Sequence, residues 1–200
     1  TLYEPMSITS LLPLLDESPF PIFLGNSLPI RYGDNFLFPQ KVASKIYSNR
    51  GVSGIDGNIS TALGICKTLN TPMVTILGDC TFLYDSEALS LMKNEIIPLI
   101  IVVINNNGGG IFNFLPYNQE KELLNKNIAP PTDLNVGHIA SSFNIPFWKA
   151  ETPSDYKKMI GHLLSESSGG IIEITSNKEE NLKIHGALNN HIKTALSKNL

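Results

Sequence analysis

The chain has 200 residues, 42% of them hydrophobic and 16% charged, with a formal net charge of -3 at pH 7. This composition can bury a sizeable core, as in an ordinary globular protein. The basic residues are scattered, which argues against DNA or RNA as a partner. The longest apolar run, Pro98 to Ile104, is too short to span a bilayer, so no membrane role is indicated. Cys66 and Cys80 lack metal-site spacing, and we expect a reduced, cytoplasmic setting.

Short apolar runs alternate with longer segments of helical periodicity along the chain. This pattern predicts an α/β fold, namely a doubly wound, mainly parallel sheet with helices on both faces. The predicted strands are about Pro21–Gly25, Met73–Leu77, Leu99–Ile104, Phe147–Lys149 and Gly170–Thr175. The predicted helices are Ser7–Leu15, Ile55–Leu69, Asp85–Ile96, Val136–Phe143, Ser154–Ser165 and about Ile184–Lys198.

Three features describe how the chain is organised around these elements. Residues 1–20 are expected to be a lead-in or linker helix, and residues 21–200 to form the main domain. The first residue is Thr1 rather than Met, which suggests a piece of a longer protein. The segment Asn113–Asp133 lacks periodicity and exceeds an ordinary connection, so we expect a disordered loop or a functional lid. Asp56, Asp85 and Ser154 are the expected helix caps.

Two polar turns follow neighbouring predicted strands. Asp79 ends one strand and Asn106 ends the next, with a single helix between them, so both emerge at the carboxyl edge where open α/β sheets bind ligands. A carboxylate, an amide oxygen and a backbone carbonyl are ligands that Mg²⁺ accepts, together with phosphate oxygens and water. The glycines Gly108–Gly110 permit a carbonyl to turn toward a metal. The stretch therefore predicts a divalent-metal and diphosphate site, the alternative being two ordinary strand-end turns.

The same stretch resembles the signature of thiamine-diphosphate enzymes, in which GDG is followed after one helix by NN. Here the residues are Gly78-Asp79 and Asn105-Asn106, and Cys80 stands where the usual pattern has its last glycine. Further segments resemble the MenD family of menaquinone-pathway synthases: GNSLPIR at 25–31, YSNRGVSGIDG at 47–57 and NNNGGGIFNFLP at 105–116. The resemblance runs from about Pro21 to the C-terminus and is strongest from Gly25 to Pro116.

The resemblance implies thiamine diphosphate and Mg²⁺ as cofactors, with Mn²⁺ a possible substitute. Asp79 and Asn106 would ligate the metal through side chains, and Gly108 through its carbonyl. Ile55 would prop the cofactor in a bent shape, the alternative being a packed isoleucine at a helix start. The full set of implied cofactor contacts is Ser53, Gly54, Ile55, Gly78, Asp79, Cys80, Thr81, Asn106 and Gly108.

The basic residues give an independent clue to the substrate. Of the 15 basic residues only Arg31 and Arg50 are arginine, and both fall in motif-like segments. A guanidinium clamps a carboxylate in a bidentate way that lysine cannot match, so we expect carboxylate binding, with ordinary surface arginines as the alternative. The resemblance implies that 2-oxoglutarate is decarboxylated and its succinyl semialdehyde carbanion is added to isochorismate. The implied substrate contacts are Asn26, Ser27, Arg31, Arg50, Ile111, Phe112 and Leu115, of which the last three would otherwise be simple core residues.

No segment resembles the N-terminal pyrimidine-binding domain that carries this family's activating glutamate, or the middle domain. We therefore expect no catalytic residue in this chain, an inactive fragment, and a homodimer or larger homo-oligomer in the complete enzyme. Two alternatives stay open: an acetolactate-synthase-like or 2-oxoacid-decarboxylase-like enzyme, and a non-catalytic nucleotide-binding or diphosphate-binding module. The glycines Gly51, Gly54 and Gly57 suggest the nucleotide-binding or diphosphate-binding module, but they lack the GxGxxG spacing of a dinucleotide site. The histidines His138, His162, His185 and His191 are expected to be packed or solvated rather than catalytic.

Overall fold

The computed structural model describes residues 3–37, 44–93, 97–116, 120–129 and 131–197. In this part of the chain one sheet of parallel strands has the order β2-β1-β3-β4-β6-β5. The strands are β1 (Ile22–Leu24), β2 (Ile46–Tyr47), β3 (Met73–Gly78), β4 (Leu99–Asn105), β5 (Phe147–Ala150) and β6 (Gly170–Thr175). The five predicted strands are therefore confirmed, and so is the parallel sheet.

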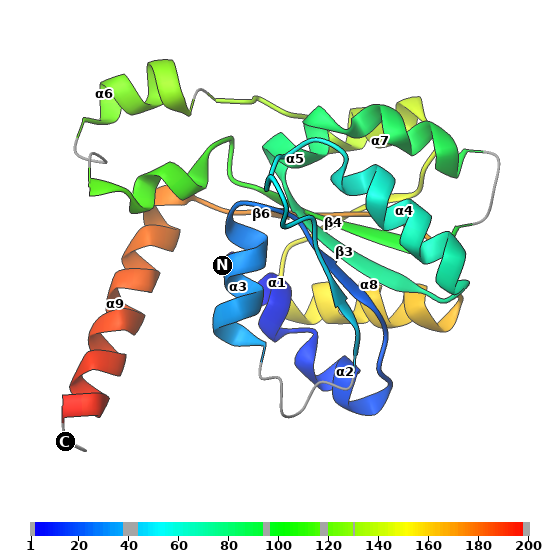
Figure 1. The fold of residues 1–200 in the computed structure, drawn as a ribbon, viewed down its shortest axis with the longest axis horizontal. Coiled ribbons are helices and arrows are strands. Elements are labelled where there is room, and N and C mark those ends of the chain that lie inside the picture. The colour runs from blue at the N-terminus through cyan, green and yellow to red at the C-terminus, as the bar shows by residue number, and fades with distance from the viewer. Residues whose placement is uncertain (1–2, 38–43, 94–96, 117–119, 130, 198–200) are drawn as a thin grey trace.

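Two helical layers enclose this sheet (Figure 1). One contains α1 (Met6–Thr9), α2 (Leu12–Glu17), α3 (Leu28–Phe36) and α8 (Pro153–Ser165). The other contains α4 (Asn58–Leu69), α5 (Asp79–Tyr84) and α7 (Val136–Ser142). Alternate strand residues serve the two layers: Val74 and Ile76 pack with the first, whereas Met73 and Leu77 pack with the second. Because both faces are covered, β3 and β4 read as nearly continuous apolar runs, and the doubly wound arrangement is confirmed.

The strand order creates a switch point beside β1. The chain runs from β1 through α3 outward to β2, and then returns through α4 to β3 on the opposite side of β1. Ligands of open α/β sheets bind at such a point, outside the carboxyl ends of the strands. Gly78 of β3 pairs with Ile104 of β4, so Asp79 and Asn106 leave the sheet at one edge, as the sequence predicts.

Some elements differ from the prediction. The edge strand β2 was missed because its two residues are too short to show periodicity. Helix α3 was missed although Pro29 in its first turn is a start signal. The helix expected from Asp85 begins at once after β3 as α5 and continues as a 3₁₀ helix, η1 (Ser86–Met92). The N-terminal helix is divided into α1 and α2, and α9 (Lys178–Ser197) begins earlier than expected. The predicted ends at Ile96 and Lys198 lie outside the described residues.

The capping predictions need correction. Asp85 does cap a helix, but the helix is α4: its carboxylate accepts hydrogen bonds from Ser60 N at 2.9 Å and Ser60 Oγ at 3.1 Å. Asp56 makes no cap, because Gly57 occupies that position with φ of 66°. Helix α8 is capped by Thr152, which exchanges hydrogen bonds with Asp155, and not by Ser154.

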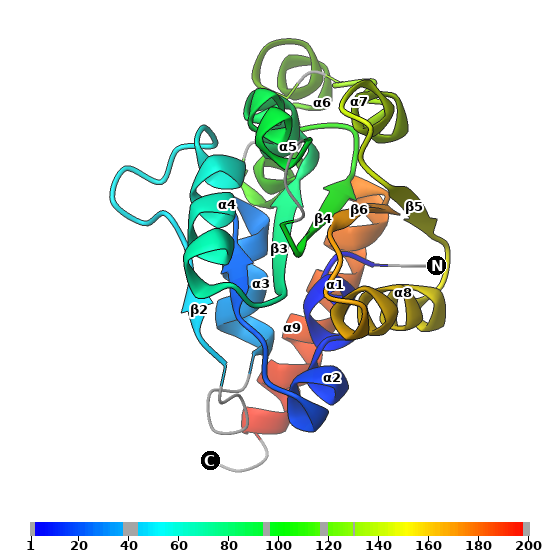
Figure 2. The same ribbon diagram turned by 90° about the vertical axis from the view of Figure 1, so that its right-hand side faces the viewer.

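The segment Asn113–Asp133 contains regular structure where the structure describes it. It includes the end of a 3₁₀ helix, η2 (Gly110–Phe114), a helical turn, α6 (Lys121–Leu123), and a π-helical turn, η4 (Leu124–Ile128). The described part of this segment is therefore regular, residues 117–119 and 130 lie outside it, and a lid function stays a prediction. Helix α9 projects from the carboxyl edge of the sheet away from the body (Figures 1 and 2). Among the described helices none is both long and apolar enough to cross a membrane.

Candidate cofactor site

A cavity of about 550 Å³, here called the cofactor cavity, lies at the carboxyl edge of β3 and β4. It brings together residues from the β1–α3 turn, the loop before α4, the strand ends and the segment Asn113–Asp133. The predicted site residues that line it are Ser27, Ile55, Gly78, Asp79, Cys80, Thr81, Asn106, Ile111 and Phe112. The segment Asn113–Asp133 contributes Ile128, Ala129, Pro131 and Thr132.

The Asp79 carboxylate joins the two polar turns. Only 2% of this residue is exposed. Its Oδ1 accepts a hydrogen bond from Cys80 N at 2.7 Å, and its Oδ2 accepts one from Gly108 N at 2.7 Å. Asn107, Gly108 and Gly109 have φ of 62°, 86° and 64°, a left-handed turn that glycine adopts without steric cost. The predicted reversal of the backbone after β4 is therefore present, and each carboxylate oxygen keeps a lone pair for a metal.

The Gly108 carbonyl already attracts a positive charge. Lys178, at the start of α9, donates hydrogen bonds to Gly108 O at 2.8 Å and Asn107 O at 3.2 Å. In this structure Gly108 O therefore faces the Lys178 ammonium, Gly108 is not among the residues that line the cofactor cavity, and its role as a metal ligand stays a prediction. Sequence reasoning missed Lys178, whose single signal was its position just after the last strand.

Asn106 leaves one polar atom without a partner. The residue is 8% exposed, and its Nδ2 donates to Glu4 Oε1 at 3.0 Å. Its Oδ1 is buried and has no hydrogen-bond partner among the described residues. A buried amide oxygen without a partner costs free energy of about 1–3 kcal/mol, which a cation at that oxygen would remove. Asn106 therefore fits its predicted role as a metal ligand.

Glu4 is a site residue that no sequence pattern singled out. It lies in the expected lead-in segment, yet only 1% of it is exposed and it lines the cofactor cavity. Burial raises the pKa of this carboxyl, hydrogen bonds from Tyr32, Asn106 and Ser176 lower it, and the Asp79 charge raises it further. The segment before α1 thus contributes to the site and not only to a connection.

The buried carboxylates indicate which ligand the cavity can hold. Glu4 and Asp79 form no ion pair with any residue that the structure describes. The described residues also contain no cluster of three His, Cys, Asp or Glu side chains that could hold a metal alone. Mg²⁺ commonly binds through one or two carboxylates and completes its shell with phosphate oxygens and water. The Asp79 carboxylate and Asn106 Oδ1 therefore fit Mg²⁺ with a diphosphate.

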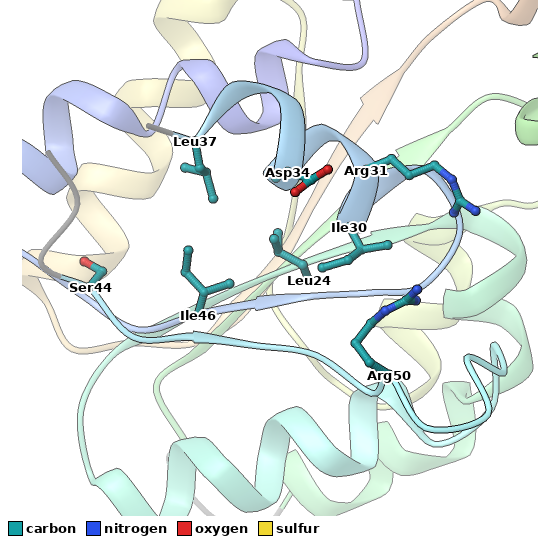
Figure 3. A pocket seen from close by; sticks show the side chains of 9 residues that line it. Leu24, Ile30, Arg31, Asp34, Leu37, Ser44, Ile46 and Arg50 are labelled. Carbon is teal, nitrogen blue, oxygen red and sulfur yellow. The ribbon is translucent and has the colours of Figure 1, made fainter. Parts of the chain in front are cut away.

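A second cavity of about 660 Å³, here called the arginine pocket, is lined by Arg31 of α3 and Arg50 of the loop after β2. Both guanidinium groups extend to the same side of this pocket, as Figure 3 shows. Arg31 Nη1 donates to Ser27 O at 2.5 Å, and Arg50 Nη1 donates to Asn26 Oδ1 at 2.7 Å. The first turn of α3 separates the arginine pocket from the cofactor cavity.

Other predicted residues lie around these two cavities. Asn26 is buried and braces the site internally, since its Nδ2 donates to Gly54 O at 2.6 Å. Ser53 is exposed, and Leu115 follows η2; neither is among the residues that line the two cavities. Ser27 has φ of 75°, a strained value for a residue with a side chain, as is common at ligand sites.

Two further side chains complete the local chemistry. Burial, followed by the Asp79 charge, raises the pKa of the Cys80 thiol, so it stays protonated beside the cavity. His185 of α9 stacks on Tyr32 with ring centroids 5.5 Å apart and meets the edge of Phe114 at 5.1 Å. The other histidines, His138, His162 and His191, are exposed. No histidine lines the cofactor cavity among the described residues.

The class of protein follows from a family comparison. Residues 32–174 match the family described as thiamine pyrophosphate enzyme, C-terminal TPP binding domain. The match covers well over half of the chain, and the chain belongs to this family.

Solved structures agree with that class. The fold resembles benzoylformate decarboxylase from Polynucleobacter necessarius with a TM-score of 0.68 and 19% identity, covering 88% of this chain and 33% of that one. It also resembles a putative thiamin diphosphate-dependent enzyme from Mycobacterium smegmatis, with a TM-score of 0.67 and 16% identity, covering 88% and 32%. At such low identity these neighbours show the shared fold alone.

Curated relatives narrow the comparison further. The chain is 38% identical over 181 residues to a 2-succinyl-5-enolpyruvyl-6-hydroxy-3-cyclohexene-1-carboxylate synthase from Chlorobium phaeobacteroides, covering 90% of this chain and 31% of the relative. It is 36% identical over 188 residues to the synthase of the same name from Bacillus cytotoxicus, covering 94% and 32%. The resemblance to menaquinone-pathway synthases is confirmed, and the chain spans about a third of the length of these relatives.

Proposed function

We propose that the chain is the cofactor-binding part of a transferase that depends on thiamine diphosphate and Mg²⁺ or Mn²⁺. This synthase would decarboxylate 2-oxoglutarate and add the remaining four-carbon unit to isochorismate, in menaquinone biosynthesis. The observation that carries the proposal is the position of Asp79 and the partnerless Asn106 Oδ1 at one cavity edge, with Gly108 N donating a hydrogen bond to Asp79 Oδ2. The relatives that bear this synthase name support the choice of reaction.

The metal ligands would hold the diphosphate through a cation. Glu4 and Asp79 place negative charge at the cofactor cavity, and no Lys or Arg lines it within the described residues. A diphosphate beside two carboxylates therefore needs a divalent cation, which Asp79, Asn106 and Gly108 would hold. Thiamine diphosphate, when bound, supplies the reactive carbon for decarboxylation and carbon–carbon bond formation.

Apolar residues would shape the rest of the cavity. Ile55 lines it from the loop before α4, whereas Ile111 and Phe112 line it from η2. Aliphatic and aromatic walls fix the orientation of a ligand and exclude water without competing for protons. Ile55 would keep the cofactor bent, and the η2 residues would face the isochorismate ring.

The arginine pocket would bind substrate carboxylates. Both proposed substrates are anionic, and a guanidinium offers paired donors for a carboxylate. Arg31 and Arg50 each hydrogen-bond to one of two consecutive residues, Ser27 and Asn26, which places them near one another and beside the cofactor cavity. Asn26 would act by holding Arg50, because its own polar atoms bond to protein groups.

Exposed apolar side chains beside the cofactor cavity support assembly with further protein. Leu83, Tyr84 and Leu91 are 43%, 66% and 58% exposed, and Leu83 also lines the cavity. Exposed apolar groups next to a ligand site commonly mark an interface. We propose a homo-oligomeric contact at this surface and a cytoplasmic location for the enzyme, and we expect the 200-residue chain to be inactive alone.

Calorimetry on the chain tests the cofactor assignment. Thiamine diphosphate, ATP and NAD are titrated separately, each with Mg²⁺, and thiamine diphosphate is repeated with EDTA. Of the three ligands, we expect only thiamine diphosphate to bind, and we expect this binding to require Mg²⁺. Preference for ATP or NAD would favour a nucleotide-binding module instead.

A chimera tests the reaction. The whole 200-residue chain replaces the matching third of the Chlorobium phaeobacteroides synthase, and carboligation is measured with 2-oxoglutarate and isochorismate, and separately with pyruvate. We expect activity with the first pair, and none from the 200-residue chain without the rest of the relative. A preference for pyruvate would assign the chain to an acetolactate-synthase-like enzyme.

A further inference from the structure

Glu4 lies where four separate parts of the chain meet. Its Oε1 accepts hydrogen bonds from Asn106 Nδ2 at 3.0 Å and from Ser176 Oγ at 2.9 Å. Its Oε2 accepts one from Tyr32 Oη at 2.7 Å, and Tyr32 Oη in turn accepts one from Asn181 Nδ2 at 3.0 Å. The carboxylate thus connects the segment before α1 with α3 and with the ends of β4 and β6.

A carboxylate is a costly choice at this position if its role is only to join these elements. Burial penalises a charged group unless it is paired, and the nearby Asp79 charge increases the penalty. No described Lys, Arg or His forms an ion pair with Glu4. Three hydrogen bonds to its two oxygens, and not an ion pair, hold the Glu4 carboxyl group in this position.

The chemistry of the carboxylate determines how Asn106 is oriented. Both Glu4 oxygens accept hydrogen bonds in this arrangement, and Asn106 turns its Nδ2 toward Oε1. Its Oδ1 then points the other way, and this oxygen is the buried atom that lacks a partner. An amide that was free to rotate would lose that freedom when its oxygen binds a metal, which would cost binding free energy.

We propose that Glu4 is a positioning residue of the metal site, which holds the Asn106 amide so that its oxygen faces the cation. The inference rests on the proposed function, because it assumes that Asn106 is a metal ligand. Glu4 acts through Asn106 and adds a second negative charge near the cation. The first residues of the chain are then part of the cofactor site.

Tyr32 provides a matched control for this role. Tyr32→Phe removes the hydrogen bond to Glu4 Oε2 but leaves the hydrogen bond from Asn106 to Oε1. Glu4→Met keeps an unbranched side chain of similar length and removes every acceptor. Glu4→Gln keeps an acceptor for Asn106 and removes the charge. If Glu4 has a purely structural role, Glu4→Met and Tyr32→Phe should lower the affinity for the metal equally. If Glu4 positions Asn106, Glu4→Met should lower this affinity more than Tyr32→Phe.

The experiment measures Mn²⁺ affinity by electron paramagnetic resonance on the 200-residue chain at saturating thiamine diphosphate. We expect Glu4→Met to weaken Mn²⁺ binding roughly 10-fold to 100-fold, the effect typical of residues that orient a metal ligand. We expect Glu4→Gln to lose less than Glu4→Met, and Tyr32→Phe to stay within about 3-fold of the wild type. Equal losses in Glu4→Met and Tyr32→Phe, or no loss in Glu4→Met, would overturn the inference.

A metal-free measurement separates this inference from the cofactor assignment. The side-chain amide resonances of Asn106, assigned with Asn106→Ser, are followed by ¹⁵N NMR in the wild type, Glu4→Gln and Tyr32→Phe. We expect the Asn106 amide resonances to shift more in Glu4→Gln than in Tyr32→Phe. The reverse order would contradict the role of Glu4, and this test does not depend on whether Glu4→Met folds. Absence of Mn²⁺ binding by the wild type would instead count against the proposed function.

Discussion

The cofactor cavity and the arginine pocket hold their charged groups in different ways. Glu4 and Asp79 are buried, and each accepts hydrogen bonds from more than one element. Arg31 and Arg50 are exposed, and their side chains are held by residues of the neighbouring turn. The fixed carboxylates suit a metal with strict geometry, whereas the exposed arginines suit substrates that enter and leave. Substitutions in the cofactor cavity should therefore change ligand affinity more than substitutions in the arginine pocket.

The largest effect is expected for Asp79→Asn. The substitution removes a carboxylate ligand, and the new amide nitrogen cannot accept the hydrogen bond that Cys80 N or Gly108 N donates. We expect metal-dependent binding of thiamine diphosphate to weaken by about 100-fold or more, measured by calorimetry.

Asp85→Asn is the matched control for Asp79→Asn. Asp85 is a buried carboxylate outside the cavity lining and caps α4 through Ser60. We expect its substitution to lower the free energy of unfolding by about 1 kcal/mol and to leave cofactor affinity unchanged. Equal losses of affinity in both variants would mean that Asp79 acts through folding alone.

A smaller effect is expected for Arg50→Lys in the arginine pocket. The charge remains, but the planar pair of donors is lost, so the KM of the chimera for its dicarboxylate substrates should rise roughly 10-fold. Cofactor affinity should not change, because Arg50 is absent from the lining of the cofactor cavity.

Lys45→Gln removes a nearby charge without touching a guanidinium and serves as the control for Arg50→Lys. Lys45 is exposed just before β2, on the same edge of the sheet. We expect its KM values to stay within about 2-fold of the wild type, since exposed charges are strongly screened. A larger change in Lys45→Gln than in Arg50→Lys would show that charge and not geometry governs the pocket.

The contrast between the two regions also bears on what the sequence could reveal. Asp79 and Asn106 were predictable because each follows a strand that both helical layers bury, and parallel strands align their ends. Glu4 was not predictable, because its hydrogen bond to Asn106 joins residues 102 positions apart. Nothing in the spacing of Tyr3, Glu4 and Pro5 distinguishes a buried carboxylate from a solvated one.

The regular elements show the same division between local and tertiary information. Strands with continuous apolar runs were found, whereas β2 depends on a tertiary partner, since its two residues pair with β1. Helix α3 was overlooked because its segment was interpreted as a binding motif, although Pro29 and the following residues allow a helix. In the site, the motif predicted a substrate-binding role for Arg31, which stays a prediction, and its place on a helix came only from the structure.

Ile55→Ala tests the apolar wall of the cofactor cavity and should have a moderate effect. Ile55 is half-buried and lines the cavity. Loss of its outer carbons should weaken thiamine diphosphate binding by about 10-fold, equivalent to roughly 1.4 kcal/mol of apolar contact. Ile65→Ala is the control, since Ile65 packs on the core from α4. We expect Ile65→Ala to lower the melting temperature without changing cofactor affinity. If Ile55→Ala also lowers the melting temperature and leaves cofactor affinity unchanged, Ile55 is a core residue only.

The smallest effect is expected for His185, which packs α9 against Tyr32 and Phe114. Burial lowers the pKa of this imidazole below its ordinary value of about 6.5. The unfolded chain then binds more protons than the folded one between the two pKa values, so the His185 contribution to stability falls as the pH drops below about 6.5. Glu4 has a raised pKa and gives the opposite slope above its ordinary value, so total stability alone cannot isolate His185.

His185→Phe keeps an aromatic ring and removes the titration. We expect the wild type to lose more stability than His185→Phe between pH 7.5 and pH 5.5, as measured by urea unfolding, because only the wild type must keep a buried imidazole neutral. Amide hydrogen exchange should locate the change in α9, where His185 lies, and His191→Gln should behave like the wild type because His191 is exposed. Parallel pH profiles in the wild type and His185→Phe would show that the imidazole is not held neutral, and that α9 binds through its apolar contacts alone.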